Sequence, residues 1–318
     1  MISNEQYMKN LAVPNRKVDV VLDTDAYNEM DDQFAISYML ASQDKINTKA
    51  IYAAPFQNVN AASPKEGMEK SYKEILHLLE LTGREDMVSN VYKGAEAFLA
   101  SPCDPQVSEA VEDMVHRAME YSPENPLYVI AIGAITNVAS ALLVCPKIAE
   151  NIVIVWLGGN EHHYPDAYEF NMMKDIYAAQ IIFKSFSPLI QVPARNVITP
   201  FTLSVFEVEA LLKRKNELCD YLREHYFTDH DFCREETKLD KPRTRVLCDV
   251  CAVAWLLNDE NRYMDCILTP RPILDNNGYY VFDTVEKRQM SCVYNIKRDA
   301  IACDMIEKIV NKDNFKRK

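Results

Sequence analysis

A buried strand, a cluster of acidic residues and a helix follow one another near the start of the chain. Residues 17–23 form a mostly apolar run that predicts a strand, and residues 33–40 continue as a helical pattern. Five carboxylates occupy the ten positions from Asp23 to Asp32. In open α/β sheets, ligands bind in the crevice beyond the carboxyl ends of the strands. The cluster therefore predicts both an α/β fold and the place of its functional site.

So many neighbouring carboxylates require a compensating charge. A helix N-terminus favours one or two acidic side chains through its free N–H groups and its dipole, but not five. Carboxylate oxygens are ligands that Ca²⁺ and Mg²⁺ prefer, so we expect a divalent cation at this position. The alternative interpretation is a solvated acidic turn in which Asp31 only caps the helix.

Strand and helix patterns alternate over the first 190 residues, which predicts an open, mostly parallel central sheet with helices on both faces. The predicted strands are 17–23, 48–53, 90–92, 127–132, 152–157 and 189–192, and the predicted helices are 31–41, 65–81, 106–121, 137–144 and 176–186. A mostly helical C-terminal subregion spans 203–262, with a charged surface loop at 234–241. Short strands follow at 264–268, 279–282 and 290–295, and a helix at 300–310. We interpret residues 1–318 as one domain.

The composition limits the function classes. The chain has 47 acidic and 35 basic residues and a net charge of −12, which disfavours nucleic acid and anionic membrane surfaces as partners. There is no apolar run of spanning length and no signal-peptide pattern at the start, so we expect a cytoplasmic protein whose nine cysteines are reduced thiols. No glycine-rich phosphate-binding motif occurs among the seven glycines.

Further polar groups follow other predicted strands, and their order resembles the inosine–uridine-type nucleoside hydrolases. That family shows an Asp-x-Asp strand end, an Asp-Asp pair, a Gly-x-x-Thr-Asn turn, a Gly-Gly strand end, Glu-Phe-Asn and an Asp before a late helix. The matching residues here are Asp23-Thr24-Asp25, Asp31-Asp32, Gly133-Ala134-Ile135-Thr136-Asn137, Gly158-Gly159, Glu169-Phe170-Asn171 and Asp249.

The resemblance implies hydrolysis of the N-glycosidic bond of a ribonucleoside to ribose and a free base, by a homodimer or homotetramer that holds Ca²⁺. It implies that Asp25 is both general base and metal ligand. The implied further ligands are Asp32, Asp249 and the main-chain carbonyl of Ile132. The residues implied to hold the ribose hydroxyls are Asp31, Glu169 and Asn171, with Asn58 as an addition.

Three departures from the family pattern affect the leaving group. The loop at 26–30 is two residues longer and lacks glycine, and Cys248 stands where a histidine is common. His163 lies in a region where an asparagine is more usual, and we expect it, with Cys248, on the substrate side of the pocket. Tyr27 and Trp156 are candidates for stacking on a base, although the apolar strand around Trp156 favours core packing.

Two other functions remain open at this level. A Mg²⁺-dependent phosphohydrolase of the haloacid dehalogenase type also begins with Asp-x-Asp after its first strand, but it has Thr or Val where this chain has Tyr27. A non-catalytic ribose- or nucleoside-binding protein on the same fold would not require the base Asp25.

Overall fold

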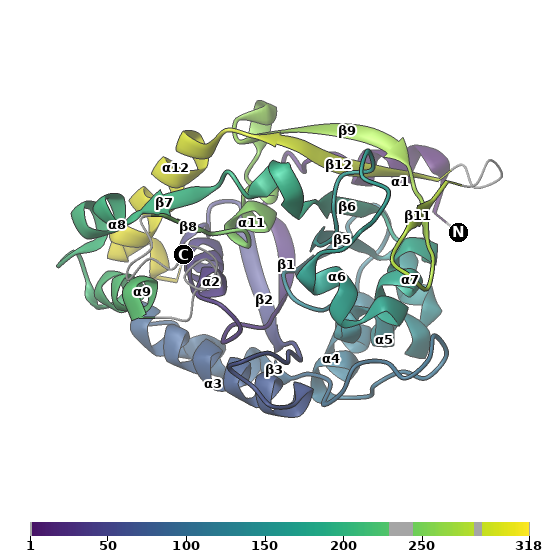
Figure 1. Ribbon diagram of the computed structural model, residues 1–318, viewed down its shortest axis with the longest axis horizontal. Helices are drawn as coiled ribbons and strands as arrows, with labels where there is room; N and C mark the ends of the chain where they lie inside the picture. Colours follow the sequence, from purple (N-terminus) through teal and green to yellow (C-terminus); the bar gives the residue numbers. More distant parts are fainter. Residues whose placement is uncertain (1, 229–243, 283–287, 318) are drawn as a thin grey trace.

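An eight-stranded sheet runs through the molecule in the order β3-β2-β1-β4-β5-β6-β12-β9 (Figure 1). The computed structural model describes residues 2–228, 244–282 and 288–317, so the predicted surface loop at 234–241 lies outside the described residues. All neighbouring strands are parallel except β9, which pairs antiparallel with β12. The sheet strands are β1 (Val18–Thr24), β2 (Ile46–Ala53), β3 (Val91–Lys93), β4 (Leu127–Ala131), β5 (Ile152–Leu157), β6 (Leu189–Val192), β9 (Met264–Pro270) and β12 (Gln289–Ile296).

Helices cover both faces of this sheet, and two small antiparallel pairs lie beside it. The helices are α1 (Asn4–Asn10), α2 (Asp31–Ala41), α3 (Pro64–Thr82), α4 (Glu109–Ala118), α5 (Thr136–Val144), α6 (Phe170–Lys174), α7 (Ile176–Lys184), α8 (Val205–Leu212), α9 (Glu217–Thr228), α11 (Val250–Leu256) and α12 (Arg298–Val310). The small pairs are β7 (Thr202–Ser204) with β8 (Thr244–Val246) and β10 (Ile273–Leu274) with β11 (Tyr280–Val281). Short turns of helix are η1 (Glu85–Asn90), η2 (Pro146–Glu150), η3 (Ala194–Ile198), η4 (Asp259–Asn261) and η5 (Lys312–Phe315).

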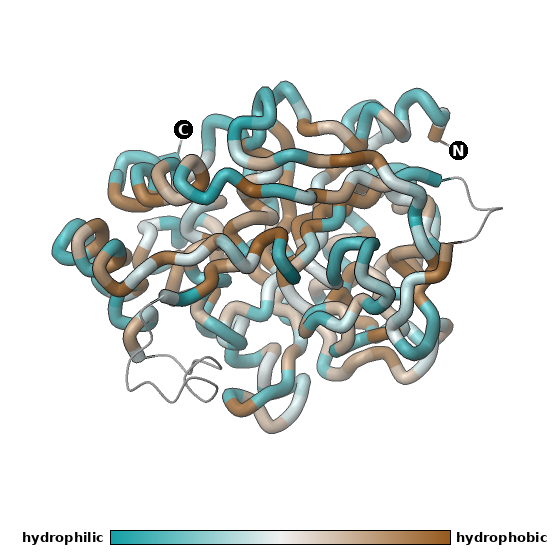
Figure 2. Tube along the Cα trace, turned by 45° about the horizontal axis from the view of Figure 1, so that its top comes forward, coloured by the Kyte–Doolittle hydropathy of each residue, from teal (hydrophilic) through white to brown (hydrophobic). Residues whose placement is uncertain are grey.

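The central strands are apolar throughout because each of them packs against a hydrophobic core on both faces of the sheet. In β5, Val153 and Val155 pack into the core shared with α2, α3, α11 and α12, whereas Ile154 and Trp156 pack into the core shared with α4, α5 and α7. Successive side chains of a strand point to opposite faces, so a strand covered on both sides reads as one continuous apolar run. In Figure 2 hydrophobic positions follow one another along the strands in the middle of the trace, and others lie on the outer helices.

The predicted α/β fold is confirmed, and the predicted strands 152–157 and 189–192 and helix 31–41 have the observed bounds. The predicted helix 106–121 is shorter, because the Ser108 hydroxyl accepts a hydrogen bond from the Val111 N–H and starts the helix at Glu109. Several short elements were not predicted because they are too short for a clear periodic signal, among them α1, α6, β7, β8 and β10.

The strand order places a topological switch point between β1 and β4. The chain continues from β1 to β2 and β3 on one side, and then returns to build β4, β5 and β6 on the other. The carboxyl ends of β1 and β4 therefore open into a crevice between loops that diverge in opposite directions, which is where open α/β sheets bind ligands. The main chain joins the two ends directly, since the Ile132 N–H donates to the Asp23 carbonyl at 2.9 Å.

Two further findings concern the described residues as a whole. Their eight cysteines are all free thiols. None of their helices has both the length and the apolar character required to cross a membrane.

Candidate active site

A cavity of about 240 Å³ lies at the carboxyl edge of the sheet, at the switch point between β1 and β4. Its walls come from the segments that follow β1, β4, β5 and β8 and from the starts of α2, α6 and η3. The residues that line it are Asp25, Asn28, Glu29, Asp31, Asp32, Ile132, Leu157, Glu169, Phe170, Asn171, Ala194, Val246, Cys248 and Asp249.

Asp25 stands at the floor of this cavity, one residue beyond β1. Its side chain is buried, and its Oδ2 atom has no hydrogen-bond partner among the described residues. Gly133 allows this placement, because a Cβ atom at that position would lie 2.8 Å from Oδ1 of Asp25. The glycine of the strand-end turn after β4 therefore makes room for the carboxylate that follows β1.

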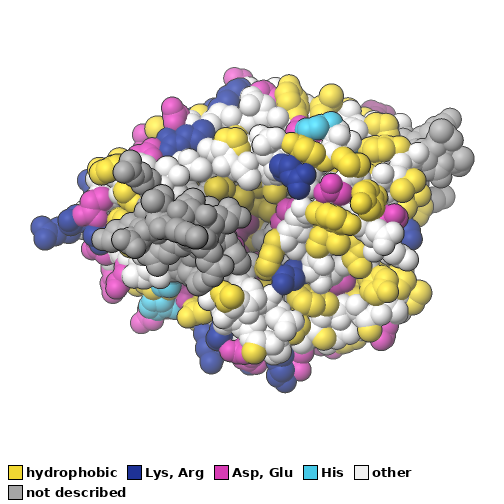
Figure 3. Space-filling view, viewed as in Figure 1, with side chains coloured by type: hydrophobic (Ala, Val, Ile, Leu, Met, Phe, Trp, Pro, Cys, Tyr) yellow, Lys and Arg dark blue, Asp and Glu magenta, His cyan; other side chains and the backbone are white. Residues whose placement is uncertain are grey.

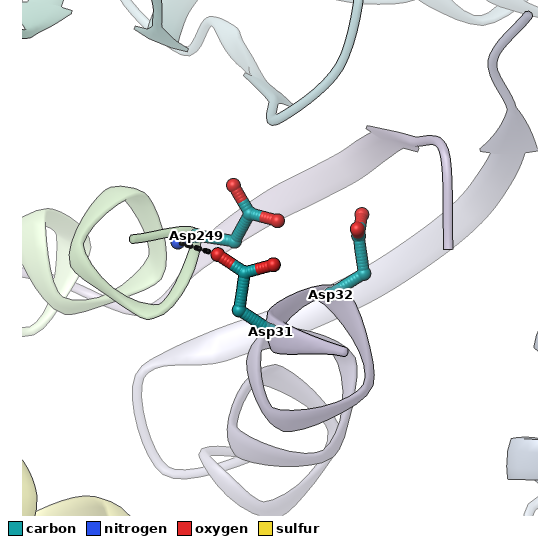
Figure 4. Close-up of side chains that lie close together, drawn as sticks. All are labelled: Asp31, Asp32 and Asp249. Atoms are coloured by element: carbon teal, nitrogen blue, oxygen red, sulfur yellow. Dashed lines mark hydrogen bonds between the residues drawn. The ribbon is translucent and has the colours of Figure 1, made fainter. Parts of the chain in front are cut away.

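Three further carboxylates converge from two helix starts. Asp31 and Asp32 are the first residues of α2, and Asp249 precedes α11 (Figure 4). One oxygen from each of the three lies within 4.8 Å of the others, and all three side chains are buried. The Asp249 N–H donates to Oδ2 of Asp31 at 3.3 Å, and the Thr24 hydroxyl donates to Asp32. The arrangement presents several oxygen ligands to one point.

Burial and mutual repulsion raise the pKa values of these acids. Desolvation is the largest cause for Asp25, Asp32 and Asp249, and the negative charge of Asp31 raises the pKa of each further. Burial also raises the pKa of Asp23 to about 7, against the opposing effect of a hydrogen bond from Asn137. Carboxylates in this condition take up either protons or a cation.

Glu169 and Asn171 approach the cavity from the start of α6. Glu169 caps this helix, since its two carboxylate oxygens accept hydrogen bonds from the main-chain N–H groups of Asn171, Met172 and Gly159 at 2.9 to 3.0 Å. Asn171 donates from Nδ2 to the carbonyls of Ile132 at 3.0 Å and Leu157 at 3.2 Å. Both residues thus reach the cavity while fixing the ends of β4 and β5.

Two predicted substrate residues lie outside the lining. Asn58 donates to Oδ1 of Asn28 at 2.6 Å and so supports a residue that does line the cavity. The His163 side chain is 60% exposed, with Nδ1 3.3 Å from Glu161. The less exposed imidazole of that loop is the half-buried His162, whose Nε2 lies 2.9 Å from Oε1 of Gln191.

The remaining candidates divide between cavity, core and surface. Cys248 is partly buried and lines the cavity, and burial raises the pKa of its thiol. Trp156 is fully buried and donates from Nε1 to the Gly133 carbonyl at 3.3 Å, as its apolar strand indicates. Tyr27 is 41% exposed and does not line the cavity; the Lys70 ammonium lies 5.8 Å from its ring centroid.

Some lining residues were not assigned from the sequence. Asn28 and Glu29 belong to the acidic loop, and Phe170 stands between two predicted site residues. Their neighbours in the sequence therefore indicated that they lie near the site. Leu157 closes the end of β5. Ala194 and Val246 come from distant segments and have no sequence pattern that marks them.

Exposed hydrophobic side chains gather on the half of this face where α6 and β11 lie, and Lys or Arg side chains stand among them (Figure 3). Tyr168, Met173, Tyr279 and Phe282 are 37% to 47% exposed. The rings of Tyr168 and Tyr279 lie 5.8 Å apart, centroid to centroid. This region continues directly from Glu169 and Phe170, so the surface beside the cavity is apolar and aromatic on one side.

Comparison with known proteins gives one consistent family. A family model described as inosine-uridine preferring nucleoside hydrolase matches residues 20–314. A pyrimidine-specific ribonucleoside hydrolase, RihA, from Citrobacter koseri is 27% identical over 256 residues, covering 72% of this chain and 77% of the relative. The enzyme of the same description from Enterobacter sp. strain 638 is 28% identical over 268 residues, covering 76% of this chain and 79% of the relative.

Solved structures agree at the level of the fold. The plant nucleoside hydrolase PpNRh1 superimposes with a TM-score of 0.72 at 20% identity, covering 92% of this chain and 99% of that chain. A purine-preferring ribonucleoside hydrolase from Gardnerella vaginalis gives a TM-score of 0.69 at 21% identity, covering 93% of this chain and 99% of that chain.

Proposed function

Because the chain belongs to the inosine-uridine preferring nucleoside hydrolase family, and is therefore a hydrolase that acts on N-glycosyl bonds, we propose that it cleaves ribonucleosides with Asp25 as the general base. The observation that carries this proposal is the buried Oδ2 of Asp25, which accepts no hydrogen bond from any described residue and lies in a cavity with three converging carboxylates. A free carboxylate oxygen in that position is able to accept a proton from water.

The residues of the cavity fit a divalent cation, in line with the metal dependence of the family. We propose Ca²⁺ held by Asp25, Asp32, Asp249 and the main-chain carbonyl of Ile132, with Asp31 left to the ribose hydroxyls. All of these are oxygen ligands of the kind Ca²⁺ prefers. When bound, the cation would supply Lewis-acid activation of water and a positive charge beside the sugar hydroxyls.

Asp31 has a second possible role, since its carboxylate is one of the three that converge. The variant Asp31→Asn separates the two roles. If Asp31 holds ribose, the purified variant keeps a stoichiometric metal content by elemental analysis while KM rises. A loss of metal would instead assign Asp31 to the cation.

The chain's own residues account for the bond-breaking step. As the C1′–N bond breaks, its electron pair leaves with the base and positive charge develops on the ribose ring. The surrounding carboxylates stabilise that charge, and Asp25 accepts the proton of the water that attacks C1′. Glu169 and Asn171 line the cavity, and we propose that they orient the sugar hydroxyls.

The base leaves more easily when it gains a proton. Cys248 is the titratable lining residue at the position where the family commonly has a histidine, and its raised pKa keeps it a neutral thiol. A neutral thiol is a weaker acid than an imidazolium near neutral pH. We therefore propose that proton delivery is shared with solvent and that Cys248 chiefly contacts the base.

A reducing-sugar assay over a nucleoside panel tests the function. The panel covers uridine, cytidine, inosine, guanosine and adenosine, since the relatives named above include pyrimidine-specific and purine-preferring enzymes. Ribose release that a calcium chelator abolishes and added Ca²⁺ restores is the expected result. Phosphate release from p-nitrophenyl phosphate without ribose release would indicate the phosphohydrolase alternative. Saturable nucleoside binding without either product would indicate a binding protein.

Assembly and location are part of the same proposal. We propose a homodimer or homotetramer of single-domain subunits that acts in the cytoplasm in nucleoside salvage. Ile267 and Leu268 of the edge strand β9 are 56% and 50% exposed, and apolar edge strands favour pairing between chains. Light scattering coupled to size-exclusion chromatography measures the number of subunits, and a monomer at micromolar concentration would contradict it.

A further inference from the structure

A second cavity, of about 380 Å³, lies at the opposite edge of the sheet. It is built at the amino ends of β1 and β2, between η1, α4 and the C-terminal segment that follows η5. The seven residues of β1 separate Lys17 at this cavity from Asp25 at the other, which is roughly 25 Å over eight steps at 3.3 Å per residue. The residues that line it are Lys17, Gln43, Ile46, Asn47, Thr48, Lys49, Arg84, Asp86, Met87, Asn90, Arg117 and Arg317.

This lining is strongly basic in a chain that is acidic overall. It contains five cationic side chains and one carboxylate, Asp86. The guanidinium of Arg84 is matched by Asp86, with Nε 2.9 Å from Oδ1, and that of Arg117 by Asp113 at 2.9 Å. The other three cations, Lys17, Lys49 and Arg317, form no close ion pair within the described part of the chain, although the charge of Arg317 helps to lower the pKa of Asp86.

A further acid that contacts the lining, Asp19, does not remove this excess of positive charge. Asp19, on β1, accepts hydrogen bonds from Asn47 at 2.5 Å and from the Tyr121 hydroxyl at 2.7 Å. Counting Asp19 against Lys17, Lys49 and Arg317 still leaves the cavity positive. Charges of one sign along a concave surface concentrate the field and attract a counter-ion of opposite sign.

The cavity is also held in shape by contacts that do not depend on a ligand. Gln43 donates from Nε2 to the carbonyls of Asn314 at 2.6 Å and Lys316 at 3.0 Å, which fixes the segment that carries Arg317. Arg84 is 7% exposed, so one of the cations lies at the buried side of the cavity rather than on open surface. The positive charges are therefore set around a defined space.

The lining selects among anions. Arg and Lys side chains are the residues that bind phosphate groups in proteins. Gln43, Asn47, Thr48 and Asn90 add amide and hydroxyl groups suited to a hydroxylated ligand, and no described lining residue is aromatic, so a nucleobase would have no ring to stack on. We propose that this cavity is a second ligand site, which binds a small phosphate monoester with hydroxyl groups, of the sugar phosphate class.

Calorimetric titration of the purified protein tests the site, with inorganic phosphate, ribose 5-phosphate and ribose as probes at constant ionic strength. Both phosphate compounds are expected to bind, ribose 5-phosphate more tightly than inorganic phosphate. The double variant Lys17→Ala/Lys49→Ala should bind both phosphate compounds about tenfold more weakly or worse, since one hydrogen bond to a charged group changes a dissociation constant by about tenfold. Nucleoside hydrolysis should be unchanged, because both lysines lie at the far edge of the sheet.

The matched control is Lys147→Ala/Lys184→Ala, which removes the same charge from two exposed lysines. Lys147 precedes β5 and Lys17 precedes β1, so the two lysines lie at the same edge of the parallel sheet. Lys147 lines neither cavity. The control should keep phosphate affinity within about twofold. The site is disproved if phosphate compounds do not saturate the protein up to about 10 mM, or if both double variants lose affinity equally. Equal affinity for phosphate and ribose 5-phosphate would disprove the sugar phosphate assignment.

Discussion

The two edges of one sheet carry opposite charges. At the carboxyl edge, six carboxylates line the first cavity, and at the amino edge five cations line the second. The net charge of −12 describes neither edge. An overall acidic balance correctly disfavours a broad polyanion surface, but it does not exclude a local anion site. Function is better argued from the charge of each cavity than from the charge of the chain.

The edges also differ in how their charges are buried. Asp25 and Asp32 are each 1% exposed, whereas Lys17 and Arg317 lie on exposed surface around the second cavity. Changing a buried charge alters local solvation and geometry together, whereas changing an exposed one alters mainly the field. Substitutions should therefore have large effects on turnover at the carboxyl edge and almost none at the amino edge.

The largest effect is expected for Asp25→Asn. Asparagine keeps the shape of the side chain but cannot accept a proton from water, and loss of a general base lowers the rate by about 10²–10⁴-fold. The measurement is kcat on the best nucleoside of the panel, together with the metal content of the variant. Asp44→Asn, an exposed change outside both cavities, controls for the loss of a carboxylate. Near-normal turnover with metal bound would mean that another residue is the base.

The second-largest effect is expected for Gly133→Ala, because this substitution moves the Asp25 side chain without replacing it. The new Cβ would lie 2.8 Å from Oδ1 of Asp25, so the carboxylate or the loop must shift. Small displacements of catalytic groups lower rates by up to about 10²-fold, and we expect a loss of about 10- to 10²-fold in kcat. Gly83→Asn is the control, since Gly83 has no neighbour within 4 Å of an added Cβ and asparagine tolerates its positive φ of 68°. Unchanged kcat would show that the position of Asp25 is not tightly constrained.

Much of the site at the carboxyl edge was predictable because several of its residues are close together in the sequence. Asp25, Asp31 and Asp32 follow one strand within eight residues, and Glu169 and Asn171 flank a single phenylalanine. Asp249 is different, because it follows β8, which pairs with β7 outside the parallel sheet, so its place beside the β1 loop was predicted from the family pattern and not from sheet topology. The structure adds what no spacing encodes, such as the exposure of His163 and the close approach of Gly133 to Asp25.

The amino edge had no comparable signal. Its cations come from five separate segments, at positions 17, 49, 84, 117 and 317, and no two of them share a motif. Lysines and arginines at strand starts and helix ends are common on protein surfaces, so only the three-dimensional arrangement distinguishes these five. The fold was predicted from local periodicity, but a site assembled from distant single residues requires the packed structure.

Cys248→Ala is expected to have a smaller effect on kcat than the two substitutions above. The thiol is neutral and partly buried, so its removal should lower kcat on inosine or uridine by less than about tenfold, far less than Asp25→Asn. Turnover of p-nitrophenyl riboside, whose leaving group needs no proton, should hardly change. His163→Ala, at an exposed position, serves as the comparison. Abolished inosine hydrolysis with retained p-nitrophenyl riboside hydrolysis in the Cys248 variant would identify the thiol as the acid.

The smallest effect concerns pH and His162, which lies beside the carboxyl edge. Its Nε2 is hydrogen-bonded to Gln191, whereas its buried Nδ1 has no partner in the part of the chain that the structure describes, so protonation would bury an N–H without an acceptor there. Burial accordingly lowers the pKa of His162, against the opposing effect of the Gln191 contact.

The sign of the pH effect follows from these pKa values. As pH falls below the ordinary histidine value of about 6.5, the unfolded chain binds a proton that the folded protein resists, so the free energy of unfolding decreases, by less than about 1.4 kcal/mol per pH unit. His162→Gln removes this titration while keeping a polar side chain beside Gln191. Urea unfolding at pH 7.5 and 5.5 should therefore show a smaller loss of stability in His162→Gln than in the wild type. The acidic cluster contributes equally to both proteins and cancels in the difference. His116→Gln, at an exposed position, is the control for losing a histidine, and an equal loss of stability in all three proteins would contradict a buried neutral His162.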